Sequence, residues 1–181
     1  MEILIRSLTY SHIAAGVVSL VAAPVAMAVA KGKDAHRIFG KVFFWCMSWI
    51  FVSATILSVY KSNFFLLLVG VFSYYSVVSG YRALYHKRLL LGEKVKPIDW
   101  LAAAIAAGFN VYFVFNGIRL VAAGNTTLGA LSLLFGGIGL LTVAGNLRSF
   151  LSPSSDRHAW LYRHISGFLA GFIASLTAFS T

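Results

Sequence analysis

The sequence is poor in charged residues, which make up only 11% of its 181 residues. Soluble globular domains carry about 25% charged residues. Hydrophobic residues make up 59% of the chain, and its mean hydropathy is +0.83. Because this composition leaves too little polar surface to cover a soluble domain, it excludes an ordinary soluble protein and indicates a membrane protein.

Acidic residues are scarcer still, with 5 Asp and Glu against 15 Lys and Arg. All of the acids lie in terminal or connecting positions between apolar segments: Glu2, Asp34, Glu93, Asp99 and Asp156. No carboxylate therefore lies in the middle of an apolar segment, where it would mark a proton relay or a sodium site. This disfavours an ion-coupled transporter.

The chain also has little that points to catalysis. Its single cysteine, Cys46, excludes an intrachain disulfide or a paired-cysteine site, and we interpret it as a small buried side chain. There is no glycine-rich phosphate loop, metalloprotease motif or nucleophile elbow. A zinc hydrolase would need three placed ligands and a base. We therefore assign no catalytic residue and favour a function that is not enzymatic.

What the chain does have is six apolar segments, each near the roughly 20 residues that span a bilayer as a helix. The predicted spans are 8–30, 38–60, 63–84, 98–121, 127–147 and 160–178. The first resembles a signal peptide, but its basic residues follow the apolar run instead of preceding it, so we interpret it as a retained helix. Since every connection is short, we predict an all-α, six-helix antiparallel transmembrane bundle forming one domain over residues 1–181.

The basic residues lie mainly in alternate connections. Twelve of the 15 lie in, or at the helix ends next to, the connections between the first and second, third and fourth, and fifth and sixth spans. Because cytoplasmic loops carry the positive excess, we predict that both termini are extracytoplasmic. Net charge +10 in short loops favours contact with anionic lipid headgroups over nucleic acid, with Arg37, Arg82 and Arg163 as the contacts.

Stripes of small residues predict which helix faces meet. The fifth span carries Gly129, Ser132, Gly136, Gly139 and Asn146 at helical spacing. In three other spans a histidine lies on the stripe: His12 in the first, His36 with Gly40 in the second, and His164 with Gly167 in the sixth. Ionisable residues on interior faces of membrane helices are functional candidates.

The second span separates its residue types by face. Trp45 and Trp49 lie about 140° to 180° around the helix from His36, so we predict that both tryptophans face away from the interior. The two other histidines, His86 and His158, have basic neighbours between spans, and we interpret them as loop residues.

An ordered set of residues resembles the bacterial predicted-membrane-protein family known as domain of unknown function 2306. The set is His12, His36-Arg37 with Gly40-Lys41, Gly80-Tyr81-Arg82-Ala83-Leu84, Asp99-Trp100, Phe135-Gly136, Trp160 with His164, and Thr177-Ala178-Phe179. It covers nearly the whole chain. The resemblance implies a multi-pass protein of the bacterial inner membrane and supplies no established activity.

Two functions fit these residues. The first is a histidine-lined pocket on the cytoplasmic side that binds lipid or a small hydrophobic molecule. The alternative is a b-type haem or quinone site for electron transfer, with His36 and His164 as ligands and Gly40 and Gly167 making room for a flat ring. Helical rise places the two ligands at depths that differ by about 9 Å, and it places His12 near the opposite face, too far away to be a co-ligand.

Overall fold

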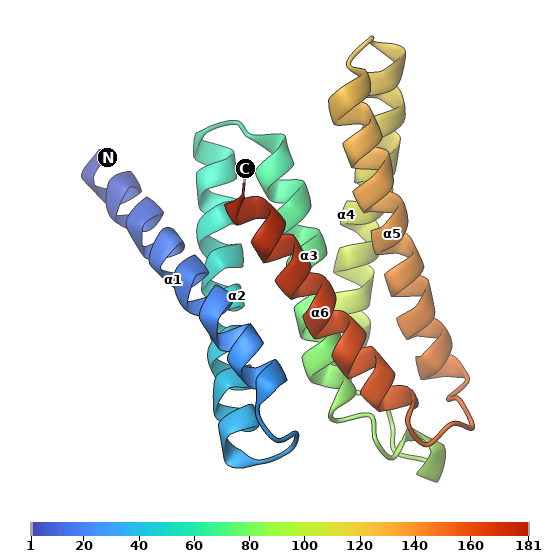
Figure 1. The fold of residues 1–181 in the computed structure, drawn as a ribbon. Coiled ribbons are helices and arrows are strands. Elements are labelled where there is room, and N and C mark those ends of the chain that lie inside the picture. Colours follow the sequence, from blue (N-terminus) through green and yellow to red (C-terminus); the bar gives the residue numbers. More distant parts are fainter. Residues whose placement is uncertain (1, 181) are drawn as a thin grey trace. The chain divides into compact units, whose positions relative to one another are not determined.

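The computed structural model describes residues 2–180, apart from the side chains of Phe65 and Leu90. This part of the chain is all-helical, with six α-helices and one short 3₁₀-helix (Figure 1). In chain order they are α1 (Glu2–Ala28), α2 (Asp34–Tyr60), α3 (Phe64–Ala83), η1 (Leu89–Leu91), α4 (Pro97–Ala122), α5 (Thr126–Leu151) and α6 (Ala159–Phe179). Each predicted span corresponds to one α-helix, which confirms the helical fold class.

Four helices of the described chain are long and apolar enough to cross a membrane: α1, α2, α4 and α5. The remaining two, α3 and α6, have 20 and 21 residues. The structure thus supports membrane association by the length and composition of its helices. The crossing of all six helices remains a prediction.

Five of the six helices extend beyond their predicted spans at one or both ends, because apolar composition marks only the part of a helix that lipid would cover. α3 lies within the predicted 63–84, and α1 ends at Ala28, two residues before the predicted end. α1 begins at Glu2 instead of residue 8, and α5 ends at Leu151 instead of residue 147. α2 begins at Asp34 instead of residue 38, since Gly32 turns the chain at φ 77° and an acid in the first turn suits the positive end of the helix dipole. The helix η1, between α3 and α4, was not predicted.

The chain divides into two compact units, each described below by itself. The first unit comprises Met1–Val77 with Leu169–Thr181, and the second comprises Val78–Phe168. The boundary passes through α3 and α6, so each of these helices contributes to both units.

In the first unit, α1 and α3 pack against α2. The rings of Phe51 and Tyr74 stack at 4.5 Å, and the Tyr74 hydroxyl donates to Ser48 Oγ at 3.2 Å. The C-terminal half of α6 joins them, where Ser175 Oγ lies 3.1 Å from Met47 Sδ. Trp45 and Trp49 are 68% and 44% exposed, which confirms that they face away from the interior of this unit.

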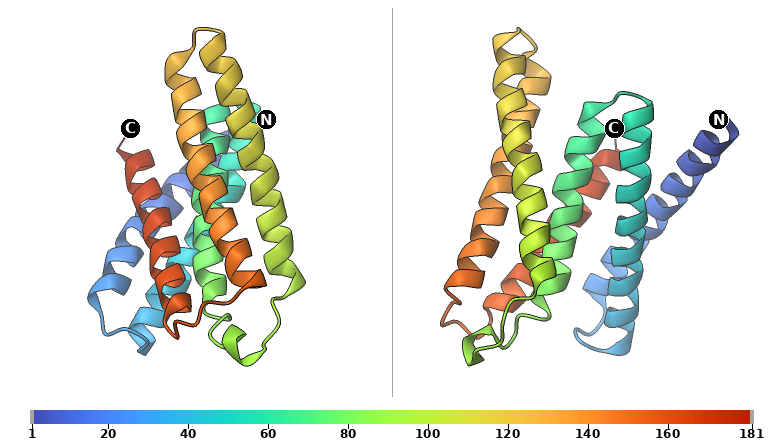
Figure 2. Two further views of the ribbon diagram at one scale, coloured as in Figure 1. Left: turned by 90° about the vertical axis from the view of Figure 1, so that its right-hand side faces the viewer. Right: turned by 180° about the vertical axis from the view of Figure 1, so that it is seen from behind.

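In the second unit, α4 and α5 form an antiparallel pair that lies side by side in both views of Figure 2. Gly124 makes the turn between them with φ 85°, and Asn125 caps α5 by accepting from the Leu128 N–H at 3.3 Å. All five residues of the predicted α5 stripe are buried, which confirms that face as the packing face.

Glycines let the backbones of α4 and α5 approach closely. A Cβ atom added to Gly129 would lie 2.9 Å from the Gly117 carbonyl oxygen and 2.6 Å from Val121 Cγ2. Further along the pair, the amide of buried Asn110 lies directly against Gly139. Such small-residue contacts are the usual means of holding membrane helices together, because lipid supplies no hydrophobic driving force between them.

A second glycine contact joins the end of α3 to the start of α6. A Cβ atom added to Gly80 would lie 3.1 Å from both Gly167 Cα and the His164 carbonyl oxygen. This approach brings together the residues that follow Gly80 and those that precede Gly167, at one end of the second unit.

We expect Gly129→Ala to lower the free energy of unfolding by about 1–3 kcal/mol, because the added methyl group overlaps the Gly117 backbone, which cannot rotate away. Gly137→Ala is the matched control on the same helix, since a Cβ atom there meets nothing within 4 Å. Thermal unfolding in detergent measures both. Equal stability of the two variants would contradict the glycine-mediated packing of α4 and α5.

Candidate functional site

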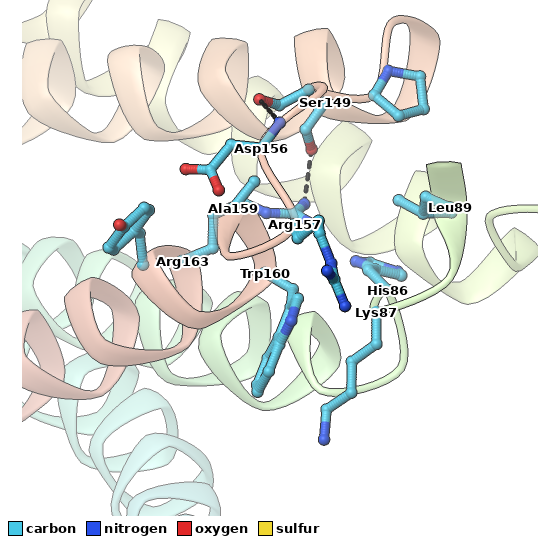
Figure 3. Close-up of a pocket in the computed structure, with 12 residues that line it drawn as sticks. His86, Lys87, Leu89, Ser149, Asp156, Arg157, Ala159, Trp160 and Arg163 are labelled. Carbon is cyan, nitrogen blue, oxygen red and sulfur yellow. Dashed lines mark hydrogen bonds between the residues drawn. The ribbon is translucent and has the colours of Figure 1, made fainter. Parts of the chain in front are cut away.

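The main polar site of the second unit lies where the connection from α3 to α4 meets the connection from α5 to α6. It contains a cavity of about 230 Å³, which we call the basic cavity (Figure 3). Its lining residues come from both connections, the end of α5 and the start of α6: His86, Lys87, Leu89, Ser149, Pro153, Ser154, Asp156, Arg157, Ala159, Trp160, Tyr162 and Arg163.

A buried carboxylate, Asp99, organises the floor of this site. Pro97 starts α4, which places Asp99 in the first turn, where its Oδ2 accepts from the Lys96 backbone N–H at 3.2 Å. Arg82 binds the same carboxylate through two hydrogen bonds, Nε to Oδ1 at 2.7 Å and Nη2 to Oδ2 at 2.9 Å. This bidentate pair joins the end of α3 to the start of α4.

His86 lies between this pair and the cavity. The residue is only 6% exposed, and its Nε2 lies 3.3 Å from Asp99 Oδ2. This is an electrostatic contact, because neither ring nitrogen has a hydrogen-bond partner of good geometry in the described part of the chain. The ring packs edge-on against Phe150 at 5.4 Å. Burial lowers the pKa of His86 below its ordinary value of about 6.5, and the Asp99 carboxylate opposes this shift.

Arg163 brings a guanidinium into the cavity wall without a carboxylate to balance it. Its Nη1 donates to Ser149 Oγ at 2.6 Å, while its Nε is buried without a hydrogen-bond partner. Among the described residues no Asp or Glu lies within ion-pair distance of Arg163. A partly buried cation with one neutral partner is poorly compensated and favours an anion nearby.

The rest of the cavity wall adds more positive charge. Lys87 Nζ lies over the Trp160 ring, 4.3 Å from its centroid, and Arg157 lines the same space. The one lining acid, Asp156, already accepts the His158 backbone N–H at 2.8 Å and faces the His158 ring at 3.5 Å. With three permanent cations and one engaged carboxylate, the basic cavity is suited to an anion.

Of the three histidines of the predicted pocket, two lie in the first unit and one lies in the second. In the first unit, His36 Nδ1 donates to the Ala26 carbonyl oxygen at 2.9 Å, and His12 Nδ1 lies 2.8 Å from Ser53 Oγ. In the second unit, His164 Nδ1 donates to the Gly80 carbonyl oxygen at 3.0 Å. The pairing of His36 with His164 in one pocket therefore stays a prediction.

The other predicted site residues differ in how closely they are packed and in what they contact. Gly40 has nothing within 4 Å of an added Cβ atom, so space is available beside it, whereas Gly167 packs on Gly80. Arg37 is exposed at the start of α2. Of the predicted headgroup contacts, Arg163 alone lines the basic cavity, since Arg82 is held by Asp99.

Sequence reasoning missed His86, which we interpreted as an ordinary loop residue. The structure buries it beside Asp99, which we had not paired with any residue. One signal could have found this site. Arg82 and His86 are four residues apart at the end of a helix, and the next acid that can reach both is the Asp99 that opens the following predicted span.

Comparison with family models, curated proteins and solved structures found no match to this chain. The resemblance to domain of unknown function 2306 therefore stays a prediction. No group of three His, Cys, Asp or Glu side chains in the described part of the chain is arranged to hold a metal ion.

We expect His86 to take up a proton only at a pH below the ordinary histidine value, because burial disfavours the charged ring. The unfolded chain then binds this proton more readily than the folded chain. The contribution of neutral His86 to the free energy of unfolding is complete above about pH 6.5 and falls as the pH drops through that value.

Imidazole NMR in detergent, with His86→Asn to assign the signal, measures this pKa. Asp99→Asn should lower the pKa of His86 further, since the substitution removes the carboxylate that raises this pKa. A His86 that titrates above its ordinary value would contradict the buried, neutral ring.

Proposed function

We propose that this chain is a multi-pass inner-membrane protein that binds the phosphate group of an anionic lipid in its basic cavity. The proposal includes six spans in an antiparallel bundle, with both termini extracytoplasmic and the basic cavity on the cytoplasmic side. The observation that carries it is Arg163, a guanidinium without a carboxylate partner, placed in one cavity wall with the buried ring of His86.

Charge and size both favour a phosphate group. The cavity has room for several water molecules at about 30 Å³ each, so a headgroup phosphate can enter it. Arg163 can direct N–H groups at two phosphate oxygens, and Lys87 and Arg157 add positive charge around them. Each of these cations would gain a charge-assisted hydrogen bond that the protein itself does not supply.

The position of the cavity favours a lipid over a soluble anion. It lies at the ends of α5 and α6, next to Trp160, and tryptophan is enriched at headgroup depth. The predicted positive-inside orientation puts this end at the cytoplasmic leaflet, which carries anionic lipids. Arg82 has a different role in this proposal, because its bond to Asp99 holds the site together.

We expect Arg163→Gln to weaken binding of anionic phospholipid about tenfold or more, since it removes the unpaired cation. The measurement is native mass spectrometry and titration of the protein in phosphatidylcholine nanodiscs with added phosphatidic acid and phosphatidylglycerol. Arg148→Gln is the matched control, because Arg148 is exposed, lies next to Ser149 on α5 and does not line the cavity.

Equal loss in both variants would indicate that total charge, and not the cavity, attracts the lipid. Soluble phosphate that displaces the lipid at low concentration would contradict a lipid site in favour of a soluble ligand.

A second candidate function is b-type haem binding through His36 and His164, and one specific observation favours it. In each residue Nδ1 donates to a backbone carbonyl. This is the arrangement typical of metal-ligating histidines, whose other ring nitrogen is fixed by a carbonyl or carboxylate. Space beside Gly40 agrees with a bulky ligand there.

We expect that haem supplied during expression would give the purified protein a Soret band, and that His36→Ala and His164→Ala would each remove it. Absorption spectra of the wild type and the two variants test this. His158→Ala is the control, because that side chain is exposed. A colourless wild-type protein would exclude haem binding.

A further inference from the structure

The basic cavity contains one group that lipid binding in general does not require, the Nδ1 nitrogen of His86. The residue is 6% exposed and lines the cavity, and this nitrogen has no hydrogen-bond partner in the described chain. We infer that His86 makes the cavity selective for phosphate monoesters over phosphodiesters. His86 can act in this way only if the cavity binds phosphate, as proposed above.

The single ring proton of neutral His86 can lie on either of its two nitrogens. A neutral imidazole carries one N–H, and the other nitrogen is an acceptor. Nε2 of His86 lies 3.3 Å from Asp99 Oδ2, and an ionised carboxylate is only an acceptor. The proton is therefore favoured on Nε2, which leaves a lone pair on Nδ1, a buried nitrogen without a partner in a residue that lines the cavity.

The surrounding groups keep the ring neutral near pH 7. Arg82 from α3 and Arg163 from α6 both disfavour a charged His86, as does burial, while Asp99 from α4 opposes them. The α5 neighbour, Phe150, is uncharged.

Besides Arg163, three charged groups line the cavity. Lys87 and Arg157 add positive charge, and Asp156 is engaged by His158. The net effect is that the pKa of His86 lies below its ordinary value.

A lone pair on His86 Nδ1 distinguishes a phosphate monoester from a phosphodiester. The free oxygens of a phosphodiester are only acceptors near pH 7, so one of them facing Nδ1 leaves two acceptors in contact. A diester can then bind well only after His86 takes up a proton, which burial disfavours. A phosphate monoester has a second pKa of about 6 and can bring the proton itself.

The monoester complex balances in charge and protons. The P–OH group donates to Nδ1, and the remaining oxygens accept from Arg163 and Lys87. Where the free ligand is a dianion, it takes up one proton from solution as it binds, and this proton lies between the phosphate and His86 Nδ1. Asp99 stays ionised and bound to Arg82. No other group has to gain or lose a proton.

The test compares phosphatidic acid, a monoester, with phosphatidylglycerol, a diester, in phosphatidylcholine nanodiscs that hold the full-length protein. At about pH 7.5 we expect phosphatidic acid to bind about tenfold more tightly, the effect of one unsatisfied buried group. As the pH is lowered in steps below the ordinary histidine value, we expect phosphatidylglycerol to bind up to about tenfold more tightly, since His86 can then take up a proton. The affinity for phosphatidic acid should rise as well, since more of the monoester then carries its proton before it binds.

His86→Asn separates this mechanism from attraction by charge alone. An asparagine amide can donate or accept, so the preference for the monoester should fall to about threefold or less. His158→Asn, at an exposed histidine of the same connection region, should keep the wild-type preference. Should His86→Asn fail to fold in thermal unfolding, the pH series of the wild type decides the question.

Two results would overturn the inference. One is an unchanged preference in His86→Asn, and the other is an affinity for phosphatidylglycerol that does not depend on pH. Either result leaves the proposed function intact, provided that Arg163→Gln still weakens lipid binding. Competition with soluble glycerol 3-phosphate shows whether the monoester is a lipid or a soluble compound.

Discussion

The polar end of the second unit depends on one buried carboxylate. Asp99 accepts two hydrogen bonds from Arg82 and one from the Lys96 backbone, and it faces the His86 ring. Without this charge, a guanidinium and an imidazole would be left partly buried beside other cations, at a cost of several kcal/mol. In a chain with so few acids, the one that is buried holds Arg82 in place and partly opposes the effect of burial on the pKa of His86. Arg163 lacks such a partner, and this difference separates the arginine that joins α3 to α4 from the arginine that lines the basic cavity.

Helix packing follows a different physical rule from the polar site. Where the helices meet, glycine and other small residues let backbones touch, as at Gly117 with Gly129 and at Gly80 with Gly167. Lipid is as apolar as leucine, so close contact and dispersion, instead of hydrophobic burial, hold such helices together. Large side chains lie away from these contacts. Trp45 and Trp49, for example, are exposed on the outer surface of their unit.

The sequence was sufficient to predict the helices and several of their faces, because both depend on local composition and a period of 3.6 residues. It was not sufficient for the site. Arg82 and Asp99 are 17 residues apart across an irregular connection, and no periodicity relates them. His86 resembled a solvated loop residue for the same reason. Spacing predicts a helix face for His36 and for His164, but it does not give their partners, the carbonyl groups of Ala26 and Gly80.

The glycine contacts between α4 and α5 and the polar contacts of the basic cavity also imply an order of assembly. The α4 and α5 pair closes across a three-residue turn, so its contacts are local in sequence and can form while the rest of the chain is still being synthesised. The basic cavity needs Arg163 from α6, which emerges after that pair is complete. The hairpin of α4 and α5 can therefore form first, and the basic cavity is complete only once α6 adds Arg163. A chain interrupted before α6 would keep Asp99 and lack Arg163.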